Sequence, residues 1–135
     1  MITLVDSNVI LDLTTDDANW FEWSAEALSR AADESTLAIN PIIYAEVSIG
    51  FRTIEELEAL LPRGDFRRLD LPYEAAFLAG KAFLKYKRRA GGRSAPLPDF
   101  YIGAHAAVAG LRLLTRDPRR YGTYFPTVEL IAPET

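Results

Sequence analysis

Short apolar runs alternate along this chain with longer segments in which apolar residues recur at three- and four-residue steps. The short runs have the length and composition of buried strands, and the longer segments have the periodicity of helices. Strands are expected at residues 2–5, 36–39, 66–71, 111–115 and 128–132. Because strands and helices alternate, the pattern predicts an α/β fold. We expect a three-layer α/β/α arrangement with a central, mostly parallel sheet of about five short strands.

Capping residues mark where several of the helices begin. Asn40 and Pro41 supply an N-cap and a preset first helical residue, and Thr53 with Glu56 forms a capping box. Helices are expected from residue 20 to 31, from 41, from 53, from 73 to the glycine pair at 91–92, and from about 99 to 108. In the helix from residue 73, the face expected to meet the core carries Tyr73, Ala76, Phe77, Gly80, Phe83 and Leu84.

Length and composition predict one packed domain covering residues 1–135. Nearly half of the residues, 49%, are hydrophobic, which excludes a disordered acidic tail. No stretch approaches the roughly 20 apolar residues of a membrane helix, and the N-terminus has no basic segment followed by an apolar one. The chain contains no cysteine, which fits a reducing compartment. A soluble cytoplasmic protein with no membrane contact is therefore expected.

The charges are unevenly distributed, although the net charge is only −4. That balance argues against a protein that coats nucleic acid through bulk charge. Six of the fifteen basic residues nevertheless lie between Lys81 and Arg93, in a stretch without any acid. This run fits a solvated helix end that complements the helix dipole, and it fits a phosphate-binding patch equally well.

Four acids occupy positions that the predicted fold brings to one edge of the sheet. Asp6 and Asp117 each follow a strand, and Asp99 begins the helix that leads into the next strand. In the helix from residue 41, Glu46 shares a stripe with Ile42, Ile49 and Gly50, where a carboxylate is expensive to bury. Open α/β sheets bind their ligands at the carboxyl ends of the strands. Acids gathered there repel one another unless protons or metal ions lie between them.

Each acid also has an ordinary structural interpretation. Asp99 fits an N-cap, Asp6 and Asp117 fit turns, and Glu46 could pair with an arginine. Other acids near element ends are interpreted as surface or capping residues, namely Asp12, Asp65, Asp70 and Glu74.

Four short segments carry a family resemblance when they are taken in order. They are VDSN at 5–8, NPIIYAE at 40–46, LPDFYIGAHA at 97–106 and LTRD at 114–117. In this order and at these intervals they resemble the PIN-domain ribonucleases. The closest likeness is to the VapC toxins of type II toxin–antitoxin pairs.

The resemblance implies a Mg²⁺- or Mn²⁺-dependent endoribonuclease whose catalytic acids correspond to Asp6, Glu46, Asp99 and Asp117. Asp6 and Asp99 are expected to bind the metal directly. Asp117 would bind a second ion or orient the attacking water, and Glu46 would hold a water. Oxygen ligands suit such hard cations, and a bound metal would activate water to attack a phosphodiester. The residues expected to support the acids are Ser7, Asn8 and Thr115.

The same resemblance implies partners. The expected substrate is single-stranded or loop RNA, the expected inhibitor is a small cognate antitoxin protein, and a homodimer is expected. Aromatic residues that could stack on unpaired bases, although most are expected in the core, are Trp20, Trp23, Tyr44, Phe51, Tyr101 and Tyr121.

Two other classes remain as alternatives. A catalytically silent RNA-binding or interaction module could share the fold. A magnesium-binding phosphoacceptor signalling domain would show adjacent acids after the first strand and a late strand-end lysine, whereas Ser7 follows Asp6 and Arg116 follows the fourth strand. The chain's single histidine, His105, cannot form an acid–base pair with a second one and is expected to pack.

Overall fold

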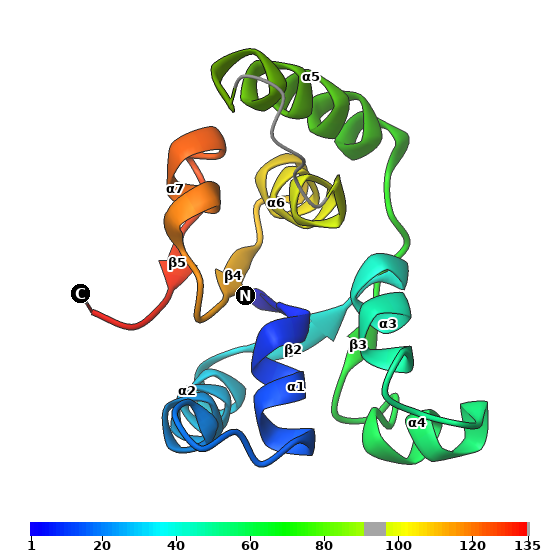
Figure 1. The fold of residues 1–135 in the computed structure, drawn as a ribbon. Helices are drawn as coiled ribbons and strands as arrows, with labels where there is room; N and C mark the ends of the chain where they lie inside the picture. The colour runs from blue at the N-terminus through cyan, green and yellow to red at the C-terminus, as the bar shows by residue number, and fades with distance from the viewer. Residues whose placement is uncertain (91–96, 135) are drawn as a thin grey trace.

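The computed structural model describes residues 1–90 and 97–134, which form five strands and seven helices (Figure 1). The strands are β1 (Ile2–Val5), β2 (Thr36–Ile39), β3 (Arg67–Arg68), β4 (Arg112–Leu114) and β5 (Leu130–Ile131). The helices are α1 (Ser7–Thr14), α2 (Phe21–Glu34), α3 (Pro41–Ser48), α4 (Ile54–Leu60), α5 (Tyr73–Ala90), α6 (Leu97–Ala109) and α7 (Arg119–Tyr124). The predicted helix end at Gly91 and Gly92, and Arg93 of the basic run, lie outside the described residues.

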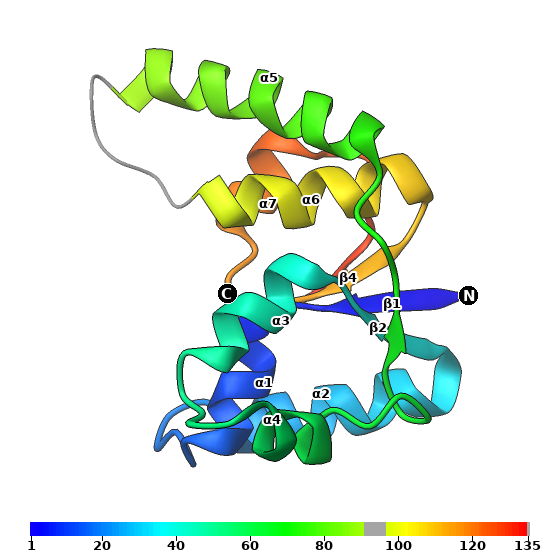
Figure 2. The same cartoon turned by 90° about the vertical axis from the view of Figure 1, so that its right-hand side faces the viewer.

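All the strand pairs are parallel, and the order across the sheet is β3-β2-β1-β4-β5. Helices α5 and α6 cover one face, with α7 packed against α6, while α1 and α2 lie on the other face (Figures 1 and 2). The predicted three-layer α/β fold with a five-stranded sheet is thus confirmed. Among the described residues, no helix is both long and apolar enough to cross a membrane.

The central strands of the sheet are apolar and fully buried over most of their length. Leu4 and Val5 of β1, Ala38 of β2 and Leu113 and Leu114 of β4 are fully buried. Central parallel strands covered on both faces need such continuous apolar runs. The rigid core therefore ends at the carboxyl edge of these three strands, where the chain first becomes polar.

The edge strands are shorter than predicted, and two short helices were not predicted. Strand β3 is only Arg67–Arg68 within the predicted 66–71, and β5 is Leu130–Ile131 within 128–132. An edge strand pairs on one side only, so its ends are less constrained. Helix α1 follows β1 directly, where a loop was predicted, with Asp6 at its N-cap position, and the second unpredicted helix is α7.

The buried face of α5 was predicted only in part, because Phe83 packs against the core but other predicted residues do not. Tyr73 and Phe77 are 90% and 69% exposed, and the residues fully buried against the core are small, among them Ala75 and Ala79. Helix α5 packs mainly on α6. Small side chains let two helices approach closely, and the larger Leu78, Phe83 and Tyr86 pack partly buried around them.

Helices α5 and α6 run antiparallel to each other (Figure 2). Helix α6 runs against the strands, so its first turn lies at their carboxyl edge, as predicted for Asp99. The same hairpin brings the C-terminal end of α5 to that end of the molecule (Figure 2).

Candidate active site

Three of the four predicted acids line one small cavity at the carboxyl edge of the sheet. Asp6, Asp99 and Asp117 face a space of about 190 Å³. The remaining lining residues are Asn8, Arg119, Arg120 and Tyr121. Residues more than 100 positions apart in sequence thus meet in one mixed acidic and basic cavity.

Asp6 is the most deeply buried of the predicted acids, with 3% of its surface exposed. One carboxylate oxygen, Oδ2, accepts hydrogen bonds from Thr115 Oγ1 and Tyr121 OH, both at 2.9 Å. Among the described residues, no cationic side chain lies within 4.0 Å of this carboxylate. Burial raises the pKa of Asp6 to about 6 despite these two hydroxyl donors, and the charges of Asp99 and Glu46 add to the rise.

Glu46 reaches the site through Ser7. The Ser7 hydroxyl donates to Glu46 Oε1 at 2.8 Å and lies 3.4 Å from Asp6 Oδ1. Burial raises the pKa of Glu46. The hydrogen bond from Ser7 opposes this rise, and the charge of Asp99 adds to it. The apolar stripe predicted for its helix is wrong, because Ile49 is 87% exposed. Glu46 lies at the rim of the site and not on a buried apolar face.

Asp99, in the first turn of α6, already has a cationic partner. Arg120 Nη1 donates to Asp99 Oδ2 at 2.5 Å. The guanidinium of Arg120 also lies over the rings of Tyr86 and Phe100, at 5.4 and 5.8 Å. Burial still raises the pKa of Asp99, although Arg120 opposes the rise, and the charge of Asp117 adds to it.

Asp117 is the most open of the four acids. Its side chain is exposed, and its backbone N–H donates to Thr115 Oγ1 at 3.1 Å. The Thr115 hydroxyl therefore connects the backbone of Asp117 with the carboxylate of Asp6.

The three predicted supporting residues lie in the expected places. Ser7 contacts Asp6 and Glu46, and Thr115 donates to Asp6. Asn8 Nδ2 donates to Thr115 Oγ1 at 3.1 Å and lies 3.4 Å from Asp6 Oδ2.

A buried ion pair next to the site was missed. Asp12, interpreted above as a surface or capping residue, is only 2% exposed. Its two carboxylate oxygens accept from Arg116 Nε at 3.0 and 2.9 Å, and Oδ2 also accepts from Ser24 Oγ at 2.7 Å. The Arg116 guanidinium lies 5.6 Å from the ring centre of Trp20. Asp12 therefore joins α1, α2 and the loop after β4.

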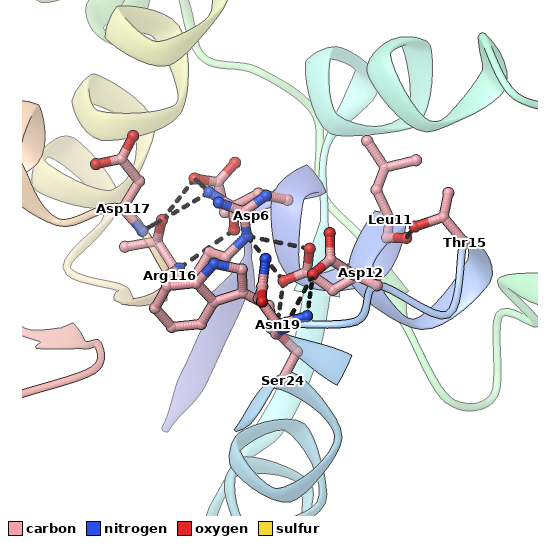
Figure 3. A network of polar contacts seen from close by, with 12 residues as sticks. Asp6, Leu11, Asp12, Thr15, Asn19, Ser24, Arg116 and Asp117 are labelled. Atoms are coloured by element: carbon pink, nitrogen blue, oxygen red, sulfur yellow. Dashed lines mark hydrogen bonds and ion pairs between the residues drawn. The ribbon is translucent and has the colours of Figure 1, made fainter. Parts of the chain in front are cut away.

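This ion pair leads directly toward Asp6 (Figure 3). The backbone N–H of Arg116 donates to Asn8 Oδ1 at 3.2 Å, and Asn8 in turn donates to Thr115, which donates to Asp6. The contacts hold the segment that carries Thr115 and Asp117 against the start of α1.

Helix α7 supplies the other contacts that were missed, those of Arg120 and Tyr121. Its position depends on close packing at Gly103 of α6, where an added Cβ would lie 2.3 Å from the ring of Phe125. The only sequence signal was Pro118 ahead of a short polar and aromatic segment. A six-residue helix has too few turns for a recognisable apolar face.

His105 packs as predicted. It is 2% exposed, and Asn40 Nδ2 lies 3.0 Å from its Nδ1. Burial lowers the pKa of His105.

The donor chemistry of the cavity fits a hard divalent cation. The carboxylates and the amide among its lining groups are the ligands that Mg²⁺ and Mn²⁺ prefer, and two arginines and a tyrosine complete the lining. Within residues 1–90 and 97–134, no three acidic or histidine side chains are close enough to enclose an ion. Mg²⁺ commonly keeps several waters and is bound through one or two protein carboxylates.

The chain was compared with protein families, curated proteins and solved structures. The PIN domain family matches residues 3–125. The chain matches none of the curated proteins.

Several solved structures share the fold at low sequence identity. A chain of VapBC2 from Rickettsia felis, bound to a DNA fragment from their promoter, is 19% identical, with 98% of each chain covered and a TM-score of 0.73. A chain of VapBC-1 from nontypeable Haemophilus influenzae is 18% identical, with 98% of each covered and a TM-score of 0.72. A chain of FitAcB from Neisseria gonorrhoeae is 22% identical, with 97% of this chain and 96% of that one covered and a TM-score of 0.66. With the family match over most of its length, the chain belongs to the PIN domain family.

Proposed function

We propose that this protein is a metal-dependent endoribonuclease toxin that cleaves single-stranded or loop regions of RNA. The observation that carries the proposal is Asp6, a buried carboxylate that has only neutral donors among the described residues and faces Asp99 and Asp117 across one cavity. Burying a charge in this way is costly unless a cation completes the site. Fold similarity to VapBC and FitAcB chains supports a toxin of this family.

Asp6 and Asp99 would hold Mg²⁺ or Mn²⁺. When bound, the metal would neutralise phosphate charge and make a water more acidic, so that the water could attack the phosphodiester. Thr115 and Tyr121 hold the Asp6 carboxylate in one orientation through their hydroxyls. Glu46, positioned by Ser7, can accept a proton from the attacking water at Oε2, because Ser7 occupies Oε1. Asp117 can orient a water at the mouth of the cavity or contribute to a second ion.

The proposal includes partners. The structures that share the fold include VapBC chains and a toxin–antitoxin complex from Klebsiella pneumoniae, which supports a small cognate antitoxin for this chain. A homodimer in the cytoplasm completes the proposal. Co-expression with the product of an adjacent short reading frame, followed by size-exclusion chromatography with light scattering, tests the antitoxin and the dimer together.

The direct test is cleavage of a fluorescently labelled single-stranded RNA by the purified protein. We expect cleavage with Mg²⁺ or Mn²⁺ and none with EDTA. Asp6→Asn and Asp99→Asn should each lower the rate by about 100-fold or more, because each removes a proposed metal ligand. Asp6→Asn keeps a side-chain oxygen for the Thr115 and Tyr121 hydroxyls, so the fold should persist.

A matched control is Asp33→Asn, which removes an exposed carboxylate on α2 and should leave the rate unchanged. Cleavage that continues in EDTA would refute the metal dependence, and equal activity in the three variants would refute the assignment of the active site to Asp6 and Asp99. RNA binding without any cleavage would instead indicate the silent module.

A further inference from the structure

A second hollow lies beside the acidic cavity, between the C-terminal end of α5 and helix α7. Its volume is about 460 Å³. It is lined by Lys85, Arg88, Arg89, Thr123, Tyr124 and Pro126, and we call it the basic hollow. Three of its six lining residues carry a positive charge and none carries a negative one.

The charges of the basic hollow are not neutralised within the described part of the chain. No described carboxylate lies within 4.0 Å of Lys85, Arg88 or Arg89. Helix α5 has no acid after Glu74, which lies at its far end, and α7 has none at all. The dipole of α5 favours cations in its last turn, by about 0.3–1 kcal/mol each. That explains basic residues at this helix end, but not why the α7 residues facing them, Thr123 and Tyr124, supply no acid.

Aromatic rings connect the basic hollow with the acidic cavity. Phe100 packs against Tyr86 and Tyr124, with ring centres 5.5 and 5.6 Å apart. On the cavity side, the Arg120 guanidinium lies over Tyr86 and Phe100. On the other side, the Arg89 guanidinium lies 5.8 Å from the ring centre of Tyr124. Arg120 and Arg89 thus stand on one continuous aromatic platform.

Helix α7 takes part in both sites. Arg119, Arg120 and Tyr121 line the acidic cavity, while Thr123 and Tyr124 line the basic hollow. Arg120 and Tyr124 are one helical turn apart, about 6 Å along the axis. The α5–α6 hairpin brings the C-terminal end of α5 to the same end of the molecule as the carboxyl edge of the sheet (Figure 2).

We propose that the basic hollow binds the phosphate backbone of the RNA strand whose scissile phosphate lies at the acidic cavity. This inference rests on the proposed ribonuclease function. A chain with a net charge of −4 and an acidic catalytic site repels a polyanion, so substrate binding requires a local source of positive charge. Lysine and arginine side chains without acidic partners, next to the ring of Tyr124, suit the backbone and bases of a flexible single strand.

The test measures binding of a labelled single-stranded RNA by fluorescence anisotropy at several salt concentrations. Asp6→Asn serves as the parent, because it should bind RNA without cutting it. The test variant adds Lys85→Gln, Arg88→Gln and Arg89→Gln to this parent. The charge-matched control adds Arg52→Gln, Arg63→Gln and Arg67→Gln, three exposed residues around α4 and β3 at the opposite edge of the sheet.

We expect the test variant to raise the Kd at least about tenfold at 150 mM salt and to reduce the slope of log Kd against log salt by about 2, since each single-strand phosphate contact contributes about 0.7. The control should change the Kd by less than about threefold. In the active protein, the same three substitutions should raise KM and leave kcat nearly unchanged.

If RNA binding weakens equally in the test and control variants, or changes in neither, the inference about the basic hollow is overturned. Cleavage by the wild type would still support the ribonuclease proposal in that case. Weaker antitoxin binding with unchanged RNA binding would also overturn it and assign the hollow to the protein partner. If the wild type neither binds nor cleaves RNA, both proposals fail together.

Discussion

Two buried aspartates from one strand–helix segment differ in a single respect, the charge of their partners. Asp6 caps α1 and Asp12 lies within it, and they are 3% and 2% exposed. Asp12 is held by the guanidinium of Arg116 and by Ser24. Asp6 is held by hydroxyl and amide groups, and by no cation among the described residues.

The difference decides how the cost of burying each carboxylate is offset. A buried acid with a built-in counter-ion has its desolvation cost offset inside the protein. Hydroxyl donors offset only part of the cost at Asp6, and burial therefore raises its pKa to about 6. The proposed metal ion would supply the cation that Asp6 lacks among the described residues.

The largest expected effect is the contrast between Asp12→Asn and Asp6→Asn in the free energy of unfolding at pH 8. Breaking a buried ion pair costs about 3–5 kcal/mol, and the partial exposure of Arg116 places Asp12→Asn near the lower end, at about 3 kcal/mol. Asp6→Asn should instead stabilise the protein by about 1–3 kcal/mol, because it removes an uncompensated buried charge. Urea denaturation of both variants measures the difference.

A second variant separates charge from packing in that contrast. Arg116→Gln removes the cation but leaves Asp12 in place, so it should destabilise the protein about as much as Asp12→Asn. If Asp6→Asn and Asp12→Asn destabilise the protein equally, the two carboxylates do not differ in charge compensation.

The next effect is a pH dependence of stability that belongs to Asp6. The folded protein keeps the Asp6 proton up to about pH 6, whereas the unfolded chain loses it near 3.8. Between these values the folded state binds more protons, so stability falls as the pH rises, and the loss is complete above pH 6. The wild type should lose up to about 3 kcal/mol relative to Asp6→Asn over this window.

Chemical denaturation at pH 4, 5, 6 and 7.5 would measure this loss. Glu46 and Asp99 also have raised pKa values and contribute with the same sign, but they are present in both proteins and largely cancel. If the difference in unfolding free energy between the two proteins is the same at all four pH values, the uncompensated buried charge does not belong to Asp6.

A bound metal ion should offset the stability cost of the buried Asp6 charge. At a Mn²⁺ or Mg²⁺ concentration 100 times its Kd, binding should stabilise the wild type by about 2.7 kcal/mol, and EDTA should reverse the effect. Asp6→Asn should show little of this shift, whereas Arg116→Gln, whose site acids are intact, should keep most of it. Thermal denaturation with and without metal makes the measurement. An equal shift in Asp6→Asn would place the ion elsewhere.

The meeting of the acids was predictable from sequence, because it follows from strand direction. Asp6 and Asp117 follow parallel strands, and Asp99 begins a helix that runs against them. The partners of the acids were not predictable in this way. Asp12 was interpreted as a surface or capping residue because its burial depends on Arg116, which lies 104 residues further along the chain.

Tyr121 was missed as a partner of Asp6 for a related reason. Its position depends on how α7 docks, which is decided by the absence of a side chain at Gly103 on another helix. Local patterns report which residues share a face of one element. They do not report which side chain from a short helix reaches an acid 115 residues away in sequence.

The smallest expected effect tests that missed contact. Tyr121→Phe removes the hydroxyl that donates to Asp6 Oδ2 and leaves the buried ring in place. Because a hydrogen bond to a charged group contributes about 1.5 kcal/mol, stability at pH 8 should fall by about that amount, and the pKa of Asp6 should rise by about one unit. At pH 4 the carboxyl is protonated, so the loss should be smaller. Tyr101→Phe is the control, since the Tyr101 hydroxyl makes no hydrogen bond to a described residue. If Tyr121→Phe lowers the stability equally at both pH values, the Tyr121 hydroxyl supports packing and not the charge of Asp6.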